Sequence, residues 1–206
     1  GQPMHAFDLS KIEGGIVVRM GRDEKVKLLD DSEVVVDTQT LVIADQSKAL
    51  AMAGIMGGDE SAVGDDTTDI LFESAWFNPL AIAGKARNYG KHTDSSHRFE
   101  RGVDPAFTPI GLEAAVRMIV DYAGGEASDL VQAGKVPDTS RSYKFDAGRV
   151  QSLVGMEISD RSQRATLKDL GFRLENDVAH VPSWRPDVMG EADLVEEVAR
   201  VASLSK

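Results

Sequence analysis

The first third of the chain is a succession of short β-branched runs separated by turn residues. GIVVRM (15–20), VKLLD (26–30) and EVVVD (33–37) are separated by Gly, Asp-Asp and Asp-Thr signals, a pattern typical of an antiparallel meander. TLVIAD (40–45) predicts a further strand, and ALAMAGIMGG (49–58), apolar throughout, predicts a strand buried on both faces. Because the backbone groups of such runs must find partners, the first part of the chain is constrained to a mixed or antiparallel sheet.

Helix signals follow these strands. An Asn-Pro pair and an Asp-Pro pair each place a capping residue ahead of a first-turn proline, and glycines mark the ends of the apolar helical patterns. The other elements predicted for this half are a loop or short helix over 1–15, a strand over 69–74, a helix over 78–90, a loop over 92–103 and a helix over 104–124.

The chain of 206 residues is long enough for one large or two small domains. Residues 126–142 lack strong periodicity and contain turn-forming residues, so we predict domains over 1–138 and 139–206. The elements predicted beyond this boundary are a strand and a helix over 144–155, a helix over 158–171, a hairpin over 172–184 and a final helix over 190–204. Two helices followed by a β-hairpin are the order of a small winged-helix-like domain. The predicted fold class is therefore α+β.

The stretch from Gly84 to Asp104 differs in charge from the rest of the chain. It is basic and rich in hydroxyl side chains, whereas the whole chain has a formal net charge of -11. Such a loop is a candidate for holding an anionic ligand, and a solvated loop between two helices is the alternative. The acidic balance argues against a protein that grips duplex nucleic acid by itself, because such proteins present a basic face.

Absent features exclude several classes of function. The sequence contains no cysteine, which rules out disulfides and thiolate metal sites and fits a cytoplasmic protein. It contains no apolar run near ~18 residues, so neither a membrane span nor a membrane partner is expected. No phosphate-binding loop, zinc-ligand spacing, nucleophile elbow or Rossmann fingerprint is present.

Three positions in the first half are candidates for chemistry, each with a structural alternative. Glu73 lies in an apolar strand, where it is either solvated on the alternating face or buried and in need of a hydrogen-bonding partner. Gly57 either offers a backbone N–H to an oxyanion or hydroxyl or forms a tight turn. His5, with apolar neighbours, is typical of a packed histidine whose ring is hydrogen-bonded.

An acidic set near the end of the chain is a candidate metal site. Asp193, Glu196 and Glu197 fall at i, i+3 and i+4 and share one helical face, and Asp187 lies one loop earlier. Carboxylate oxygens without cysteine or histidine suit a hard cation such as Mg²⁺. The alternative is a solvated acidic first turn, which the helix dipole favours.

Five motifs together resemble one family. GQPMHAFD, ALAMAGIMGG, LFESAWFNP, HTDSSHRFERGVDP and PSWRPDVMGEADLVEEVAR occur in this order, and through them the whole chain resembles the central part of the bacterial phenylalanyl-tRNA synthetase β subunit. The resemblance implies an α/β editing module, called B3/B4, followed by a B5 module, a small domain with a DNA-binding-like fold.

The resemblance also implies that the first module hydrolyses Tyr-tRNA(Phe), the mischarged product that a phenylalanine pocket fails to reject. A second pocket that hydrogen-bonds the extra hydroxyl discriminates by roughly 10⁴–10⁵-fold. In this matching Glu73 accepts that hydrogen bond and the Gly57 N–H completes the contacts. The catalytic residues implied, near the ester and the terminal adenosine, are His5, Thr93 and Ser95. Of these, His5 and Thr93 position the attacking water.

Partners and ions complete what the resemblance implies. The residues assigned to scaffolding or tRNA-end contacts are His92, His97, Arg98 and Arg101. The implied Mg²⁺ ligands, near the interface with the α subunit, are Asp187, Asp193, Glu196 and Glu197. The full enzyme, a heterotetramer with that subunit, uses ATP to attach phenylalanine to tRNA(Phe). The alternatives are a non-catalytic tRNA-binding and subunit-assembly module with a decayed editing site, and a free-standing nucleic-acid-binding protein.

Overall fold

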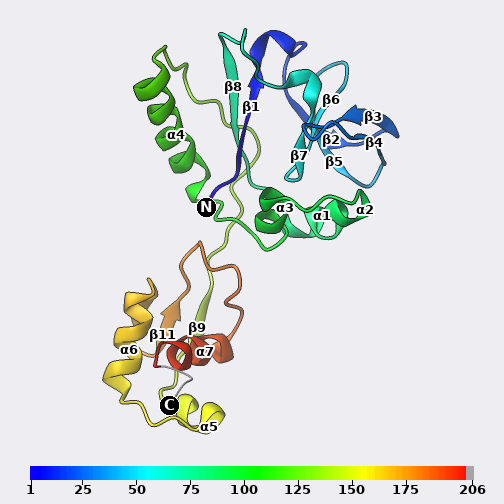
Figure 1. Cartoon of the computed structure of the whole chain (residues 1–206). Helices are drawn as coiled ribbons and strands as arrows, with labels where there is room; N and C mark the ends of the chain where they lie inside the picture. The colour runs from blue at the N-terminus through cyan, green and yellow to red at the C-terminus, as the bar shows by residue number, and fades with distance from the viewer. Residues whose placement is uncertain (203–206) are drawn as a thin grey trace. The chain divides into compact units, whose positions relative to one another are not determined.

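The structure, a computed structural model, describes residues 1–202. It divides into two compact units, Gly1–Gly134 and Lys135–Lys206, each with a buried core of its own. Figure 1 shows both units, with the chain coloured by residue number. Both units combine helices with antiparallel sheet, so the predicted α+β class is confirmed. The division at residue 134 falls inside the aperiodic segment over 126–142.

The first unit contains a four-stranded antiparallel sheet of order β2-β5-β6-β7 and a separate hairpin. The strands of the sheet are β2 (Val17–Met20), β5 (Leu41–Ala44), β6 (Ala49–Met52) and β7 (Met56–Gly57). The hairpin consists of β3 (Glu24–Lys27) and β4 (Glu33–Val36). Two 3-10 turns accompany them, η1 (Leu9–Lys11) and η2 (Asp59–Ser61).

The predicted meander is wrong in one pairing. β3 and β4 pair with each other as expected, but β2 pairs with β5 and not with its neighbour β3. The physical reason is burial. Most residues of β5 are buried and most residues of β2 are exposed, so the more apolar strand takes a central place between β2 and β6.

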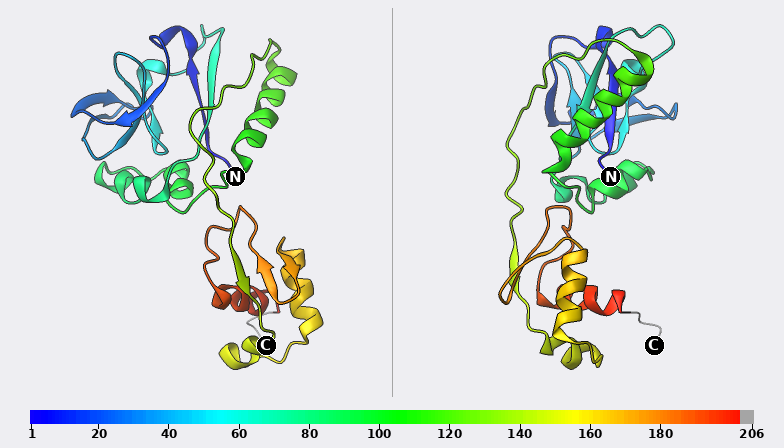
Figure 2. Two further views of the ribbon diagram at one scale, coloured as in Figure 1. Left: turned by 180° about the vertical axis from the view of Figure 1, so that it is seen from behind. Right: turned by 90° about the vertical axis from the view of Figure 1, so that its left-hand side faces the viewer.

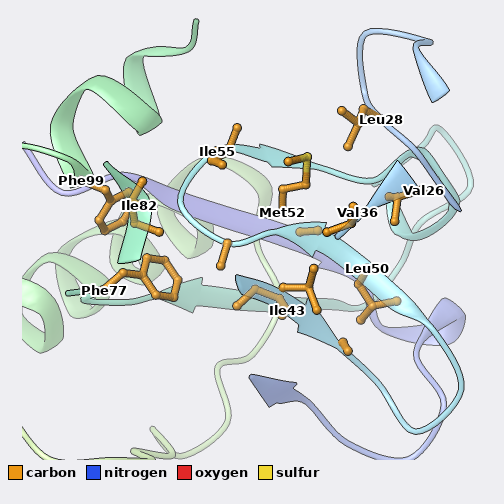
Figure 3. Close-up of a cluster of buried hydrophobic side chains, with 14 of the residues drawn as sticks. Val26, Leu28, Val36, Ile43, Leu50, Met52, Ile55, Phe77, Ile82 and Phe99 are labelled. Carbon is orange, nitrogen blue, oxygen red and sulfur yellow. The ribbon is translucent and has the colours of Figure 1, made fainter. Parts of the chain in front are cut away.

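The apolar segment over 49–58 forms a hairpin and not the single strand that was predicted. The chain reverses through Gly54, whose φ of +68° is a conformation that glycine adopts at little cost. An ideal Cβ on Gly54 would lie 3.1 Å from Phe99, 3.2 Å from Phe77 and 3.3 Å from Ile82. The β6–β7 turn is therefore packed into the core of the unit, which Figure 3 shows.

The N-terminal stretch is a strand and not the predicted loop or short helix. β1 (Met4–Asp8) pairs antiparallel with β8 (Ile70–Ser74), where a strand was correctly predicted. Pro3, just ahead of β1, disfavours a helix, and the strand satisfies its backbone groups through a partner far along the chain. Local pattern does not reveal such a partner.

α4 (Phe107–Ala123) lies along the β1–β8 ribbon, as Figures 1 and 2 show. Ser74 Oγ of β8 donates a hydrogen bond to the carbonyl of Thr108 at 2.8 Å. An ideal Cβ on Gly111 of α4 would lie 3.0 Å from Met4 Cε, so this glycine lets the helix approach β1 closely. α4 therefore covers the face of the ribbon that carries Met4 and Ser74.

Three short helices separate β8 from α4: α1 (Pro79–Ile82), α2 (Lys85–Asn88) and α3 (Asp94–Phe99). The helix predicted over 78–90 is broken in two because Gly84 takes the left-handed conformation, with φ of +75°. α3 replaces the loop predicted over 92–103. Thr93 and Ser96 form a capping box, which stabilises a helix too short for apolar periodicity to reveal.

The second unit has a three-stranded antiparallel sheet of order β10-β11-β9. Its described elements are β9 (Ser142–Lys144), α5 (Gly148–Val154), α6 (Asp160–Asp169), β10 (Arg173–Glu175), β11 (Val178–His180) and α7 (Glu191–Val201). The predicted hairpin and helices are confirmed, whereas the winged-helix-like arrangement stays a prediction. Residues 203–204 of the final predicted helix lie outside the described residues. Across residues 1–202, no helix is both long and apolar enough to cross a membrane.

We expect Gly54→Ala to destabilise the first unit more than Gly84→Ala. Both glycines have positive φ, so each alanine costs about 1–2 kcal/mol of backbone strain. Nothing lies within 4 Å of an ideal Cβ at Gly84, whereas crowding of the core at Gly54 adds about 1–3 kcal/mol. Urea unfolding of the wild type and both variants measures the difference. Equal losses of stability would contradict the packing of the β6–β7 turn.

Candidate active site

Two titratable side chains face each other on the β1–β8 ribbon. His5 of β1 and Glu73 of β8 are direct partners in the antiparallel register, and directly opposed residues project from the same face of a sheet. Phe7 lies on this face too, is fully buried, and meets the His5 ring edge-on at 4.4 Å between ring centroids. His5 and Glu73 therefore lie on the core-facing side of the ribbon, opposite to the side that α4 covers.

Gly57 of β7 lies against the His5 ring. An ideal Cβ on Gly57 would lie 2.3 Å from His5 Cε1, 2.7 Å from His5 Nε2 and 3.0 Å from Leu29 Cδ1. The imidazole therefore occupies space that only a glycine leaves open. The Gly57 carbonyl also accepts a hydrogen bond from the Leu29 N–H at 3.1 Å. Three predicted site residues, His5, Gly57 and Glu73, thus come from three different strands and meet around the histidine ring.

Burial shifts both titratable groups toward their neutral forms. It raises the pKa of Glu73 from 4.5 to about 7 and lowers the pKa of His5 below its ordinary value of 6.5. Within residues 1–202, no hydrogen bond or charge offsets the effect of burial on Glu73. In the part of the chain that the structure describes, the buried His5 Nε2 has no hydrogen-bond partner, so this nitrogen lacks the hydrogen bond expected of a packed histidine. An unpaired buried nitrogen is costly, and a ligand that pairs with it removes the cost.

Thr93 and Ser95 reach this site through the β6–β7 turn. Thr93 Oγ1 donates to the Ile55 carbonyl at 2.7 Å and accepts from the Ser96 N–H at 3.0 Å. Ser95 Oγ donates to the Gly54 carbonyl at 3.0 Å. Both hydroxyl protons are therefore committed to backbone oxygens just ahead of β7. These contacts support the turn, and the catalytic role predicted for the two hydroxyls stays a prediction.

The basic stretch over 84–104 is mostly α2, α3 and their connections. His92, His97, Arg98 and Arg101 are all exposed. Arg101 Nη1 lies 3.0 Å from His97 Nδ1 and donates to the His97 carbonyl at 3.1 Å. An exposed side chain can contact a large partner or support the local structure. The two roles predicted for these residues, scaffolding and contact with the tRNA end, therefore stay predictions.

Lys91 is the one basic residue of this stretch that is buried, with 8 % of its surface exposed. Its Nζ donates to Asp30 Oδ2 and to Ser32 Oγ, each at 2.5 Å, in the tip of the β3–β4 hairpin. The hydrogen bonds that Asp30 accepts from Lys91 and from Ser32 lower the pKa of its carboxyl group to about 2. Sequence analysis missed this role. The hairpin tip and the lysine are 61 residues apart, and no local pattern links them.

Two of the four predicted Mg²⁺ ligands share an arginine in the second unit. Arg185 Nη2 lies 2.5 Å from Asp187 Oδ2 and 2.7 Å from Glu197 Oε1. Arg200 pairs with the other oxygen of Glu197 at 2.5 Å. Burial by itself raises the pKa of Glu197, but the hydrogen bonds from the two arginines outweigh it and hold that pKa below its ordinary value.

The other two predicted ligands do not join this network. Asp193 Oδ2 accepts a hydrogen bond from the Met189 N–H at 2.7 Å, and Glu196 is exposed. In the part of the chain that the structure describes, no group of three or more His, Cys, Asp or Glu side chains is suited to hold a metal ion. The donors as arranged do not fit Mg²⁺, because Arg185 and Arg200 already neutralise Asp187 and Glu197. Magnesium binding stays a prediction, and no chemistry is assigned to it.

Each unit matches a known family. Residues 1–124 match the B3/4 domain, and residues 143–203 match the tRNA synthetase B5 domain. The whole chain is 53% identical to part of the phenylalanine–tRNA ligase beta subunit of Ruegeria pomeroyi and 52% identical to that of Cereibacter sphaeroides. For the beta subunit of Dickeya dadantii the identity is 49% over 98% of the chain. The chain spans about a quarter, 26%, of each of these relatives.

Solved structures give a weaker likeness. An N-terminal fragment of the phenylalanyl-tRNA synthetase beta-subunit from Pyrococcus horikoshii aligns with 95% of this chain and 58% of its own length. The identity is 15% and the TM-score is 0.45, which is too low to support an argument.

We expect Glu73→Gln to remove a pH-dependent contribution to the free energy of unfolding. With a pKa near 7 in the folded chain and 4.5 as its ordinary value, Glu73 binds a proton in the folded state that the unfolded state releases across this window. Its contribution is therefore complete below pH 4.5 and is lost as the pH rises toward 7, by at most about 3 kcal/mol. The opposite contribution of His5 is common to both proteins. Urea unfolding from pH 4.5 to 8 measures the difference, and parallel curves would contradict the shifted pKa.

We expect Arg185→Met to destabilise the second unit by about 1–3 kcal/mol, since it leaves the buried Glu197 carboxylate with one arginine fewer. Arg161→Met, at an exposed position of α6, is the control and should change little. Thermal unfolding with and without millimolar Mg²⁺ measures both variants. The wild type should be insensitive to Mg²⁺ and Arg185→Met should regain stability with it. A strong Mg²⁺ effect on the wild type would contradict the arginine-centred network.

Proposed function

Because this chain belongs to the B3/4 domain family and carries a tRNA synthetase B5 domain after it, we propose that its first unit is an editing module that hydrolyses Tyr-tRNA(Phe). One observation carries the proposal. His5 and Glu73 are adjacent and partly buried, and in the described residues the His5 Nε2 atom is buried without a hydrogen-bonding partner, beside a glycine that leaves room for the histidine ring.

Glu73 is the residue we propose for recognition of the tyrosine hydroxyl. A phenol O–H donates to its carboxyl group, which is partly buried and whose pKa is raised by desolvation. Phenylalanine has no such donor, so its binding leaves that acceptor unpaired, at about 1–3 kcal/mol. The same asymmetry explains why a site built around a hydroxyl rejects an analogue that lacks it. The Gly57 N–H is proposed as a second contact of the same hydroxyl.

His5 is the residue we propose for activation of the attacking water. Its lowered pKa keeps the ring neutral near pH 7, so the unpartnered Nε2 can accept a proton. Water attacks the ester carbonyl carbon while its proton passes to Nε2. The bond from that carbon to the ribose oxygen then breaks, and the imidazolium returns the proton to the ribose oxygen. No covalent enzyme intermediate is needed, because an aminoacyl ester is already activated.

Thr93 and Ser95 have a supporting place in this proposal. Their hydroxyl protons go to the Ile55 and Gly54 carbonyls, so they hold the turn that leads to Gly57. Thr93 Oγ1 retains an oxygen lone pair with which it can help to orient the water. Direct participation of these hydroxyls is part of the proposal.

The larger enzyme supplies the remaining functions in this proposal. The curated relatives are phenylalanine–tRNA ligase beta subunits about four times as long as this chain. We infer that the chain acts within such a ligase, which attaches phenylalanine to tRNA(Phe) with ATP, and that its partners are tRNA(Phe) and the α subunit. Delivery of the tRNA by other parts of the enzyme is consistent with the acidic charge of this chain.

A second function is favoured by one observation. The hydroxyls of Thr93 and Ser95 are both bound to backbone oxygens, as expected for a scaffold. This favours a non-catalytic module for tRNA binding and subunit assembly whose editing site has decayed. Such a module binds tRNA or the α subunit without deacylation, which separates the two functions in a single assay.

Deacylation of Tyr-tRNA(Phe) and Phe-tRNA(Phe), by this chain and by the whole synthetase side by side, tests both functions. Glu73→Ala should lower the preference for tyrosine by about 10- to 100-fold, the value of one such hydrogen bond. His5→Ala should lower the rate with both substrates. Glu113→Ala, at an exposed carboxylate of α4, is the control and should change neither.

Unchanged discrimination in Glu73→Ala would remove Glu73 from the recognition site. If Glu73→Ala loses the preference for tyrosine but His5→Ala keeps the wild-type rate, only the water-activating role proposed for His5 would be wrong. If neither the chain nor the whole synthetase deacylates Tyr-tRNA(Phe) but both bind tRNA or the α subunit, the second function is correct.

A further inference from the structure

Residues 91–95 contact both loops that flank Gly57. Thr93 and Ser95 donate to carbonyls of the β6–β7 turn, as described above. Lys91, two residues before Thr93, reaches in the other direction and binds the tip of the β3–β4 hairpin. One short segment therefore connects the loop that leads into Gly57 with the loop that packs onto it.

The tip of the β3–β4 hairpin is docked onto Gly57 and its neighbour. Leu28 is fully buried and forms an isolated antiparallel bridge with Gly58. The Leu29 N–H donates to the Gly57 carbonyl at 3.1 Å, and Leu29 Cδ1 lies 3.0 Å from the position of an ideal Gly57 Cβ. The His5 ring lies beside the same position, 2.3 Å away at Cε1. A displacement of this tip therefore changes the space beside the His5 ring.

The contact of Lys91 with the tip differs in kind from an ordinary surface ion pair. A buried ammonium group must be paired, because its removal from water is expensive. Lys91 has 8 % of its surface exposed, and its two partners, Asp30 and Ser32, are also bonded to each other, Ser32 Oγ to Asp30 Oδ1 at 2.6 Å. The bond between Ser32 and Asp30 already closes the turn at the tip of the β3–β4 hairpin. The Lys91 ammonium group therefore fixes the orientation of this turn as a unit.

The same hairpin carries a matched comparison. Lys25 of β3 and Glu33 of β4 form an ion pair at 2.9 Å, with side chains 73% and 59% exposed. Exposed pairs of this kind contribute little to stability. Loss of Lys25 therefore removes one lysine charge from the hairpin without loosening its tip.

We propose that Lys91 is a positioning residue of the candidate site, whose buried ammonium group holds the tip of the β3–β4 hairpin against Gly57 and so sets the space beside the His5 ring. Lys91 does not bind substrate and acts through the tip. Its effect on hydrolysis rests on the proposed editing function, whereas its effect on the tip is a property of this chain by itself.

Backbone amide exchange and the NMR signals of the His5 imidazole test the positioning in the 206-residue chain without any substrate. In Lys91→Met, the amides of Leu29 and Asp31, which donate to Gly57 and Leu28, should exchange at least about tenfold faster. The His5 ring signals should shift, and amides of α6 and α7 in the second unit should not change. Lys91→Arg keeps the charge and should stay close to the wild type, as should Lys25→Met.

Asp30→Asn provides a second route to the same contact. The Asp30 side chain is 41% exposed, so this variant weakens the bond to Lys91 without placing a new group in the core. It should reproduce the faster exchange at the tip if Lys91→Met fails to fold. Unchanged exchange at Leu29 and Asp31 in a folded Lys91→Met, or in Asp30→Asn where Lys91→Met is unfolded, would overturn the proposal.

Deacylation of Tyr-tRNA(Phe) by the whole synthetase tests the consequence for function. Lys91→Met should lower kcat about 10- to 100-fold, as expected for a misplaced reacting group. The preference for tyrosine over phenylalanine should be retained, because Glu73 is untouched, and Lys91→Arg should restore most of the rate. A loosened tip with an unchanged kcat would overturn the link to hydrolysis. If the wild type shows no deacylation, the editing function fails, and the exchange and NMR results still decide whether Lys91 positions the tip.

Discussion

The antiparallel pairing of β1 with β8 is the interaction on which the site depends. It places His5 directly opposite Glu73 and gives the ribbon two different faces. One face is covered by α4, through Gly111 and the bond from Ser74 to Thr108. The other face turns His5 and Glu73 toward the core, where burial shifts both pKa values. Without the pairing, His5 and Glu73 would not be adjacent, and burial would not shift their pKa values toward the neutral forms.

The site costs stability that the rest of the first unit supplies. An unpartnered imidazole nitrogen and an uncompensated carboxyl both oppose folding, and neither packs as well as an apolar side chain. The surrounding core compensates, with fully buried residues on β1, β4, β5 and the β3–β4 tip. Supporting bonds from Lys91, Thr93 and Ser95 then hold the flanking loops. Polar groups left without partners inside an otherwise well-packed unit are a common signature of a ligand site.

The second unit handles its buried carboxylate in the opposite way. Glu197 is more buried than His5 and Glu73, which are only partly buried, and Arg185 and Arg200 neutralise it. Arg185 also lies over the Phe172 ring, 5.9 Å from its centroid, and its backbone carbonyl accepts a hydrogen bond from Arg141. The result is a neutralised carboxylate with a structural role, whereas the first unit keeps the buried His5 Nε2 atom without a partner in the described residues.

The sequence by itself determined the alternating strands, the Pro and Gly signals of most helices, the α+β class and the residue types of the site, because these depend on side-chain period and backbone preference within a few residues. It also singled out His5, Gly57 and Glu73 through motif resemblance. Only the tertiary structure decided that β1 is a strand, that β2 pairs with β5, that Lys91 holds a hairpin tip and that Arg185 occupies the acidic set. The strand pairings and the Lys91 contact join residues distant along the chain, and Arg185 reaches Glu197 twelve residues away; local pattern carries no record of which of these partners is chosen.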